Sequence, residues 1–177
     1  MYTIHIDNLS DQSDYTDLIS SHIQDRSISI AFCYNSDFKN THAIRRLVES
    51  ICTQLWVDEQ WMHRIVLMVD ELNNNAIEHG SQQSTQNEMR IEISRQQQEY
   101  TISIECEDSW TGPSPKAAVD MEILHRDVKA RGFKNHHSIR WRGLFLIIDQ
   151  IVDSLYFKDS EKWGLIVWIQ KKIALSE

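Results

Sequence analysis

The segment from Asp58 to His79 constrains the fold more than any other part of the sequence. Its large apolar residues lie four, three, four and four positions apart, which is the spacing of one face of an α-helix; they are Trp61, Ile65, Met68, Leu72 and Ala76. Gly80 follows at once, and glycine readily takes the left-handed conformation that ends many helices. The sequence therefore predicts a helix over 58–79 that buries one continuous apolar stripe and ends at Gly80.

Shorter patterns on both sides of this helix predict strands and further helices. Alternating apolar residues predict strands over 2–6 and 27–32, and two more strands follow at 89–94 and 100–107. The expected helices are a short one over 14–23, one capped by Thr41 that runs to Leu55, and one opened by Gly143 that runs to Ile151. Residues 108–139 show little periodicity and predict a long loop, while 154–158 and 163–170 predict a closing strand pair. Because strands and helices do not alternate regularly, we expect an α+β fold with helices on one face of a mixed sheet.

The charge balance narrows the classes of partner. A net charge of −8 argues against nucleic acid as a general partner, because neutralising phosphates requires surplus Lys and Arg. Basic residues are concentrated from Lys116 to Arg142, where seven stand against three acidic residues. This segment predicts an anion-binding region or, equally, a solvated basic loop.

No sequence feature predicts export or a membrane segment. The N-terminus lacks the basic and apolar regions of a secretory signal, and the apolar runs 144–148 and 165–169 are too short to cross a bilayer. Cys33, Cys52 and Cys106 are far apart, which favours free thiols in a reducing compartment over a disulfide or a zinc site. We therefore expect a cytoplasmic protein that does not contact a membrane.

A polar face adjoins the apolar stripe. Glu71, Asn75 and Glu78 lie four and three positions apart and share one side of the helix. Phosphoryl transfer would use such a face, because the side-chain carbonyl of Asn75 can ligate Mg²⁺ and Glu71 can orient or deprotonate an attacking hydroxyl. The alternatives from the residues alone are a tolerated exposed face for Asn75 and a capping or partly buried histidine at His79.

Three segments resemble the sequence boxes of one ATPase superfamily. Residues 69–79, Val-Asp-Glu-Leu-Asn-Asn-Asn-Ala-Ile-Glu-His, resemble the N-box of the GHKL ATPases and are most similar to that of the anti-sigma-factor serine kinases. Residues 108–112, Asp-Ser-Trp-Thr-Gly, resemble the adenine-binding box Asp-x-Gly-x-Gly. Residues 140–147, Arg-Trp-Arg-Gly-Leu-Phe-Leu-Ile, resemble the last box, in which a lid ends and a helix opens at the phosphates. The three boxes stand in matching order and spacing over about residues 28–170.

This resemblance implies a fold, two cofactors and a set of site residues. The fold is a Bergerat-type two-layer sandwich over 26–177, preceded by an N-terminal extension over 1–25, and the cofactors are ATP and Mg²⁺. Glu71 would be the catalytic base, Asn75 the Mg²⁺ ligand, and Asp108 the acceptor for the adenine amino group. The remaining nucleotide-binding positions that the resemblance implies are His79, Gly112, Arg142, Gly143 and Leu144.

The chain departs from the family pattern at three positions. Trp110 and Trp141 stand where the family has glycine, and Leu165 follows Gly164 where threonine is usual. Tryptophan adopts a positive φ only at a cost, and its indole fills space that a nucleotide would need. These departures bear on nucleotide binding more than on the fold.

Functions of different classes therefore stay open. By resemblance, the chain is an ATP-binding anti-sigma factor that binds a sigma factor and phosphorylates an anti-anti-sigma protein on serine, and members of that family often form homodimers. The alternative is a degenerate binding module with the same fold, which regulates partner proteins without nucleotide turnover. An ATP-binding domain with another hydrolytic or scaffolding role is a third class.

Overall fold

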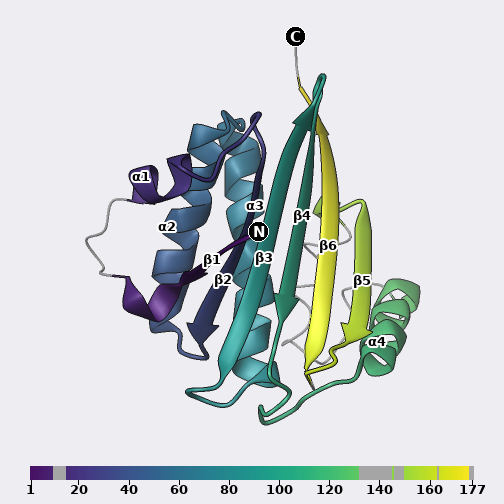
Figure 1. Ribbon diagram of the computed structural model, residues 1–177. Helices are drawn as coiled ribbons and strands as arrows, with labels where there is room; N and C mark the ends of the chain where they lie inside the picture. Colours follow the sequence, from purple (N-terminus) through teal and green to yellow (C-terminus); the bar gives the residue numbers. More distant parts are fainter. Residues whose placement is uncertain (10–14, 132–144, 146–149, 163, 176–177) are drawn as a thin grey trace.

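A computed structural model of the protein describes residues 1–9, 15–131, 145, 150–162 and 164–175 (Figure 1). Its elements in chain order are β1 (Tyr2–His5), η1 (Ile6–Asn8), α1 (Tyr15–Ser20), β2 (Ile28–Asn35), α2 (Lys39–Gln54), α3 (Glu59–Asn75), η2 (Ala76–Gly80), β3 (Gln86–Gln96), β4 (Glu99–Glu107), α4 (Ala118–Arg131), β5 (Ser154–Asp159) and β6 (Leu165–Ala174). The strands form one six-stranded sheet in the order β1-β2-β3-β4-β6-β5. The pair β1–β2 is parallel and the other pairs are antiparallel, so the expected α+β class with a mixed sheet is confirmed.

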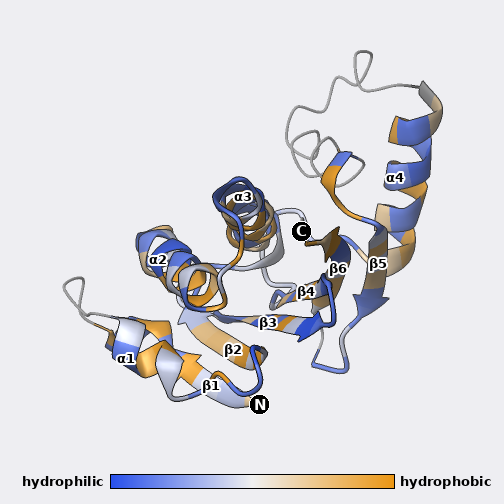
Figure 2. Ribbon diagram, turned by 90° about the horizontal axis from the view of Figure 1, so that it is seen from above, coloured by the Kyte–Doolittle hydropathy of each residue, from blue (hydrophilic) through white to orange (hydrophobic). Residues whose placement is uncertain are grey.

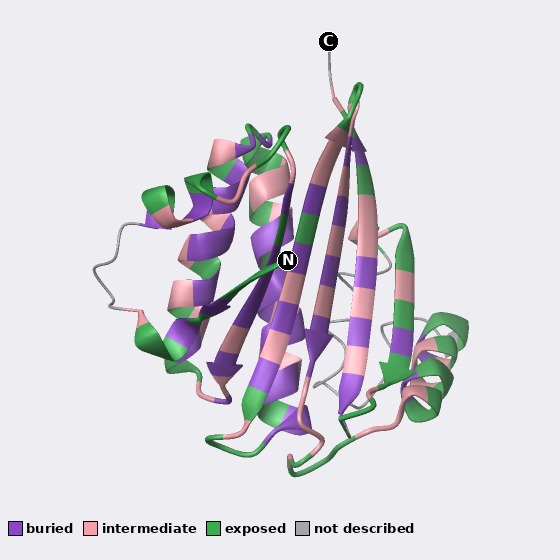
Figure 3. Ribbon diagram, in the orientation of Figure 1, coloured by how far each residue is buried: buried purple, intermediate pink, exposed green. Residues whose placement is uncertain are grey.

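The helices and the sheet form two layers. Figure 2 shows α2 and α3 side by side over one face of the sheet, with α4 beside β5 at the edge away from β1. Along β3 and β4, buried residues alternate with more exposed ones (Figure 3), because successive side chains of a strand point to opposite faces. The sheet face opposite α2 and α3, called the outer face below, carries charged residues from these two strands; they include Glu88, Arg90, Glu105 and Glu107.

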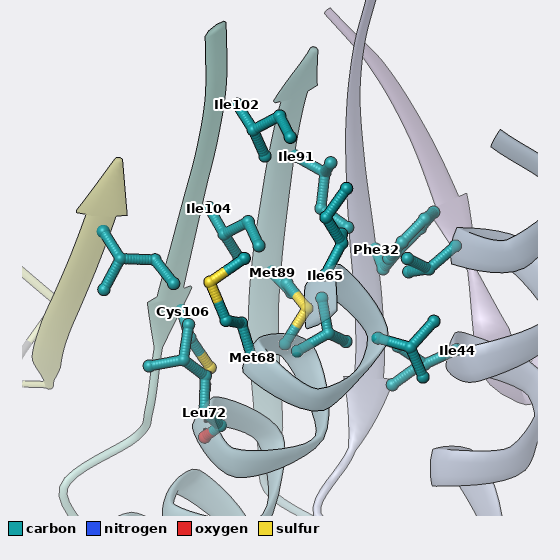
Figure 4. Close-up of a cluster of buried hydrophobic side chains, with 14 of the residues drawn as sticks. Phe32, Ile44, Ile65, Met68, Leu72, Met89, Ile91, Ile102, Ile104 and Cys106 are labelled. Carbon is teal, nitrogen blue, oxygen red and sulfur yellow. Dashed lines mark hydrogen bonds between the residues drawn. The ribbon is translucent and has the colours of Figure 1, made fainter. Parts of the chain in front are cut away.

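The hydrophobic core lies between α3 and the centre of the sheet. Ile65, Met68 and Leu72 of α3 point toward β3 and β4, and each side chain is at most 2% exposed (Figure 4). Full burial of a side chain of this kind contributes about 1.5–3 kcal/mol. The predicted apolar stripe is therefore confirmed, and Trp61 at its start is partly buried against the same core.

The two long helices begin with different capping arrangements. At α3, the carboxylate of Asp58 accepts hydrogen bonds from the backbone N–H groups of Gln60 at 2.9 Å and Trp61 at 3.4 Å. The prediction that Thr41 caps α2 is wrong, because α2 already begins at Lys39. The Thr41 hydroxyl instead accepts a hydrogen bond from Asn73 Nδ2 at 2.9 Å and thereby connects α2 to α3.

The long helix does not end as predicted. The α-helical hydrogen bonds stop at Asn75, and residues Ala76–Gly80 form one π-helical turn. Gly80 does not take a left-handed φ, so the predicted reason for glycine at this position is wrong. A Cβ atom on Gly80 would overlap the side chain of Asp108, and this close approach is the reason for glycine. Single π-helical turns are frequent at functional sites.

A helix replaces part of the predicted loop over 108–139. Helix α4 occupies residues 118–131 and packs against β5. It buries Met121 and Val128, and Leu124 is partly buried against the same core. These three residues have helical spacing, which the basic composition of the segment obscured. Most of the helix predicted from Gly143 to Ile151 lies outside the described residues, and only 145, 150 and 151 are described, as helical.

The N-terminal residues contribute to the sheet. Strand β1 is an edge strand beside β2, and Ile4 and Ile6 are buried. The division into an extension over 1–25 and a domain over 26–177 stays a prediction. No helix in the described part of the chain is long and apolar enough to cross a membrane.

Candidate functional site

The family-like residues gather at one end of the sheet, where α3 ends and β4 ends (Figure 1). Two backbone hydrogen bonds close this region: Asp108 N donates to Leu165 O, and Gly112 N donates to Gly80 O, each at 3.1 Å. A small cavity lies there, of about 10 Å³, enough for roughly one water molecule. The residues around it are Leu72, Asn75, Ala76, Cys106, Asp108, Leu165 and Val167. The structure thus brings Asn75 and Asp108 to one cavity, but Glu71 does not line it and the cavity is far too small for a nucleotide.

Asp108 is held in one orientation by the backbone. Its Oδ1 atom accepts hydrogen bonds from the N–H groups of Trp110 at 3.0 Å and Leu165 at 2.9 Å. Burial raises the pKa of this carboxyl group, and the two N–H groups partly oppose that rise. Oδ2 lies close against Gly80 and accepts no hydrogen bond from the described residues, so it is the oxygen left for a ligand's donor. The geometry therefore suits recognition of a donor such as an amino group.

Trp110 keeps the backbone conformation that a glycine would favour. Its φ is 52°, in the left-handed region, which costs a residue other than glycine about 1–3 kcal/mol. Its indole Nε1 is buried and has no hydrogen-bond partner among the described residues. The loop thus takes a left-handed φ at the position where the family box has its middle glycine, and the strain is borne by the surrounding contacts.

A cluster of hydroxyl groups fixes this strained loop. Ser109 Oγ lies 2.9 Å from Ser81 Oγ and 2.8 Å from Thr85 Oγ1, and Ser109 N donates to Ser81 Oγ at 3.0 Å. The Thr111 hydroxyl lies 2.7 Å from Ser109 Oγ and accepts from Gln82 N at 3.0 Å. Sequence reasoning missed this cluster, because its members come from two loops whose proximity no local pattern reveals.

Glu71 and Asn75 lie one helical turn apart at the end of α3. Asn75 Nδ2 donates to the backbone carbonyl of Glu71 at 2.7 Å, so the amide oxygen Oδ1 is directed away from that carbonyl. Burial, and then the charges of Asp70 and Glu78, raises the pKa of Glu71. A carboxylate with a raised pKa is a better proton acceptor than one with the ordinary value. Glu71 is not among the described residues that line the small cavity.

His79 and Gly112 pack against each other. The resemblance implied that both residues contact a nucleotide. His79 is 3% exposed, and its Nδ1 lies 3.4 Å from Ser114 Oγ. A Cβ atom on Gly112 would overlap the backbone of His79, so the close approach that the structure shows at Gly112 is to the π-helical turn. The roles of both residues toward a nucleotide stay predictions.

Three predicted site residues, Arg142, Gly143 and Leu144, lie outside the described residues, as does Trp141. The adjacent Phe145 is described: it is buried and stacks on His125 of α4, with 5.1 Å between ring centroids. Among the described residues, no group of three or more His, Cys, Asp or Glu side chains is placed to hold a metal ion. A metal held by Asn75 would therefore need oxygen ligands from a bound molecule and from water.

Comparisons with known proteins place the chain in a family. Residues 34–171 match the family model of the histidine kinase-like ATPase domain. Among solved structures, the chain is similar to one from the crystal structure of the SiaB–SiaC complex from Pseudomonas aeruginosa, with 12% identity and a TM-score of 0.46 over 92% of this chain and 100% of that one. No curated protein sequence matches. The chain belongs to the family of histidine kinase-like ATPase domains.

Proposed function

We propose that this protein binds ATP with Mg²⁺ at the Asn75–Asp108 cavity and transfers the γ-phosphoryl group to a serine of a partner protein. The observation that carries the proposal is the arrangement of three groups. Asp108 presents a fixed acceptor, Asn75 lines the same cavity, and Glu71 lies one turn before Asn75 with a raised pKa. ATP binding by histidine kinase-like ATPase domains supports it.

Each group has a separate task in this proposal. Asp108 Oδ2 accepts a hydrogen bond from the adenine amino group. Asn75 Oδ1 would hold Mg²⁺, and the ion would neutralise phosphate charge. Glu71 accepts the proton of the serine hydroxyl while the hydroxyl oxygen bonds to the γ-phosphorus and the bond to the β–γ bridging oxygen breaks. The products are a phosphoserine and ADP, and the proton stays on Glu71 until it passes to water.

The partners follow from the resemblance to anti-sigma-factor serine kinases. The phosphorylated partner is an anti-anti-sigma protein, and the partner that the kinase restrains is a sigma factor. The chain then acts as a switch between two protein partners in the cytoplasm, in keeping with a charge of −8 that disfavours direct nucleic-acid binding.

A variant at Glu71 tests the proposed chemistry. Isothermal titration calorimetry with ATP and Mg²⁺ should show binding by both the wild type and Glu71→Gln. Phosphorylation of a purified anti-anti-sigma protein from the same genome, followed by intact mass, should be lost in Glu71→Gln. Glu59→Gln is the matched control, because Glu59 is an exposed carboxylate at the start of the same helix and does not contribute to the raised pKa of Glu71. Phosphate transfer that survives Glu71→Gln would remove Glu71 from the role of base.

The second candidate function is a binding module without nucleotide turnover. Two observations favour it: the cavity beside Asp108 has room for about one water, and a tryptophan, Trp110, stands where the family has glycine. Calorimetry separates the two candidates, because the absence of heat and of a thermal shift at millimolar ATP would select the binding module.

A further inference from the structure

A buried charge lies on the outer face of the sheet, directly next to the proposed adenine-binding residue. Glu107 is the last residue of β4 and is 8% exposed. A buried carboxylate is costly unless it is paired and hydrogen-bonded. Its described partners are the hydroxyl of Ser160, which donates to Oε1, and two cations near Oε2: Arg90 Nη2 at 3.7 Å and Lys162 Nζ at 4.0 Å.

Ser160 belongs to the turn that joins β5 to β6. Its backbone N–H donates to Gly164 O at 2.7 Å, and its Oγ accepts from Lys162 N at 3.0 Å while it donates to Glu107. The hydroxyl therefore connects the turn to the carboxylate on β4. A Ser160 side chain without a hydroxyl would leave Glu107 with the two more distant cations only.

The same turn carries the donor that orients Asp108. Leu165 follows Gly164, and its N–H donates to Asp108 Oδ1 at 2.9 Å. Gly164 packs so closely on Asp108 that a Cβ atom there would overlap the Asp108 carbonyl. A shift of the turn would therefore move the Leu165 N–H relative to Asp108 and free the carboxylate to rotate.

We propose that Glu107 and Ser160 are positioning residues, which hold the β5–β6 turn so that the Leu165 N–H fixes Asp108 with Oδ2 toward the ligand. This inference rests on the proposed function. A fixed acceptor at Asp108 makes the site selective among nucleotides, because it favours a base with an amino group at position 6 over a base with a carbonyl there. Neither residue touches the nucleotide, and both act from the outer face through the turn.

The test begins without nucleotide. The variants are Ser160→Ala, Glu107→Gln, the conservative Ser160→Thr and the control Ser29→Ala. Ser29 suits this purpose because its hydroxyl donates to Glu92 at 3.0 Å on the same outer face, far along the strands from Asp108. The readouts are the pKa of the Asp108 carboxyl by ¹³C NMR and the hydrogen-exchange rate of the Leu165 amide.

We expect Ser160→Ala to raise the pKa of Asp108, because the Leu165 N–H lowers it in the intact protein. Glu107→Gln also removes a charge that raises this pKa, so that variant is judged by exchange of the Leu165 amide alone. Exchange of the Leu165 amide should become roughly tenfold faster, the change that about 1.4 kcal/mol of lost protection produces. Ser160→Thr should restore both values, and Ser29→Ala should leave them unchanged. An unaltered Asp108 pKa and unaltered Leu165 exchange in folded Ser160→Ala would overturn the proposal.

Calorimetry with ATP and inosine triphosphate then addresses selectivity. The ratio of the two affinities should fall roughly tenfold in Ser160→Ala and Glu107→Gln, because a carboxylate free to rotate no longer holds its acceptor toward the amino group. A ratio that stays at the wild-type value, despite a moved Asp108 pKa, would overturn the selectivity claim. A wild type that binds neither nucleotide would remove the proposed function, while the NMR readouts would still decide the positioning role.

Discussion

Replacing Asp108 by asparagine reverses the hydrogen-bond polarity at one atom and leaves the surrounding contacts in place. In the wild type, Oδ1 accepts from Trp110 N at 3.0 Å and from Leu165 N at 2.9 Å. An amide oxygen can accept both of these bonds, so the asparagine Nδ2 takes the place of Oδ2. A donor then faces the adenine amino group, which is itself a donor.

The expected loss of ATP affinity follows from two terms. A hydrogen bond to a charged acceptor contributes about 1.5–3 kcal/mol, and a buried donor without a partner costs about 1–3 kcal/mol. Together they predict that Asp108→Asn weakens ATP binding at least about sixtyfold, at about 1.4 kcal/mol for each factor of ten. Inosine triphosphate should lose far less, because its carbonyl at position 6 can accept from the new Nδ2.

The same substitution should stabilise the protein without nucleotide at neutral pH. Burial raises the pKa of Asp108, so the folded state binds this proton more tightly than the unfolded state does. The free energy of unfolding therefore falls as pH rises from the Asp108 pKa of the unfolded state to the higher Asp108 pKa of the folded state. Above both pKa values the full cost of enclosing the charged carboxylate is present. The melting temperature of Asp108→Asn should exceed that of the wild type at pH 7.5, and the difference should vanish as pH falls below about 4.

Calorimetry with both nucleotides and differential scanning calorimetry across pH measure these effects. Asp17→Asn is the control, because it makes the same chemical change at an exposed position of α1. Unchanged ATP affinity in Asp108→Asn, or an equal loss for ATP and inosine triphosphate, would refute the assignment of Asp108 as the base-reading acceptor.

Three further predictions concern α3 and the two loops at its ends. If Glu71 is the base, the single-turnover rate of phosphate transfer should fall as pH drops through the pKa of Glu71. Burial raises that pKa above its ordinary value of 4.5, so the rate should begin to fall at a higher pH than for an exposed glutamate. A rate that does not depend on pH in this range would contradict the role. Trp56 is 85% exposed with φ 62°, so Trp56→Gly should raise the unfolding free energy by about 1 kcal/mol and the melting temperature by about 2–4 °C, whereas Trp56→Ala, which keeps a Cβ atom, should give no gain. Equal stability of these two variants in urea unfolding would show that backbone strain is not the cause. Gly80→Ala should lower the unfolding free energy by about 1–3 kcal/mol, because its Cβ atom would overlap Asp108; a variant as stable as the wild type would show that Asp108 can move aside.

The parts of the fold that were predictable from the sequence depend on local periodicity. The stripe of α3 and the strands β3 and β4 repeat apolar residues at the helical and extended periods, so their buried faces could be assigned without tertiary information. Asp108 and Asn75 could be placed near each other because their segments resemble boxes of one superfamily. Both line one small cavity, while their roles toward a nucleotide stay predictions.

The features that the sequence did not reveal depend on contacts between distant segments. The π-helical turn over 76–80 lies where Gly112 packs on His79, and no residue within the turn announces that contact. Helix α4 was missed because only three apolar residues at helical spacing mark it within a basic segment. The positive φ of Trp110 opposes the residue's own preference, and it is sustained by hydrogen bonds from loops 81–85 and 108–112.

The three described glycines near the site all lie where there is no room for a Cβ atom. Gly80 and Gly164 both approach Asp108 so closely that a Cβ atom would overlap it, and Gly112 approaches the turn that contains Gly80. Trp110, by contrast, shows that the left-handed conformation of the loop can be held without glycine. The glycines around Asp108 thus serve close packing rather than backbone conformation. The Asp108 carboxylate accepts hydrogen bonds from the N–H groups of Trp110 and Leu165, which an apolar residue in the same enclosure would leave unpaired. Asp108 therefore has a structural role at the end of β4 in both candidate functions, so the titration with ATP, and not the enclosure of the carboxylate, separates the two.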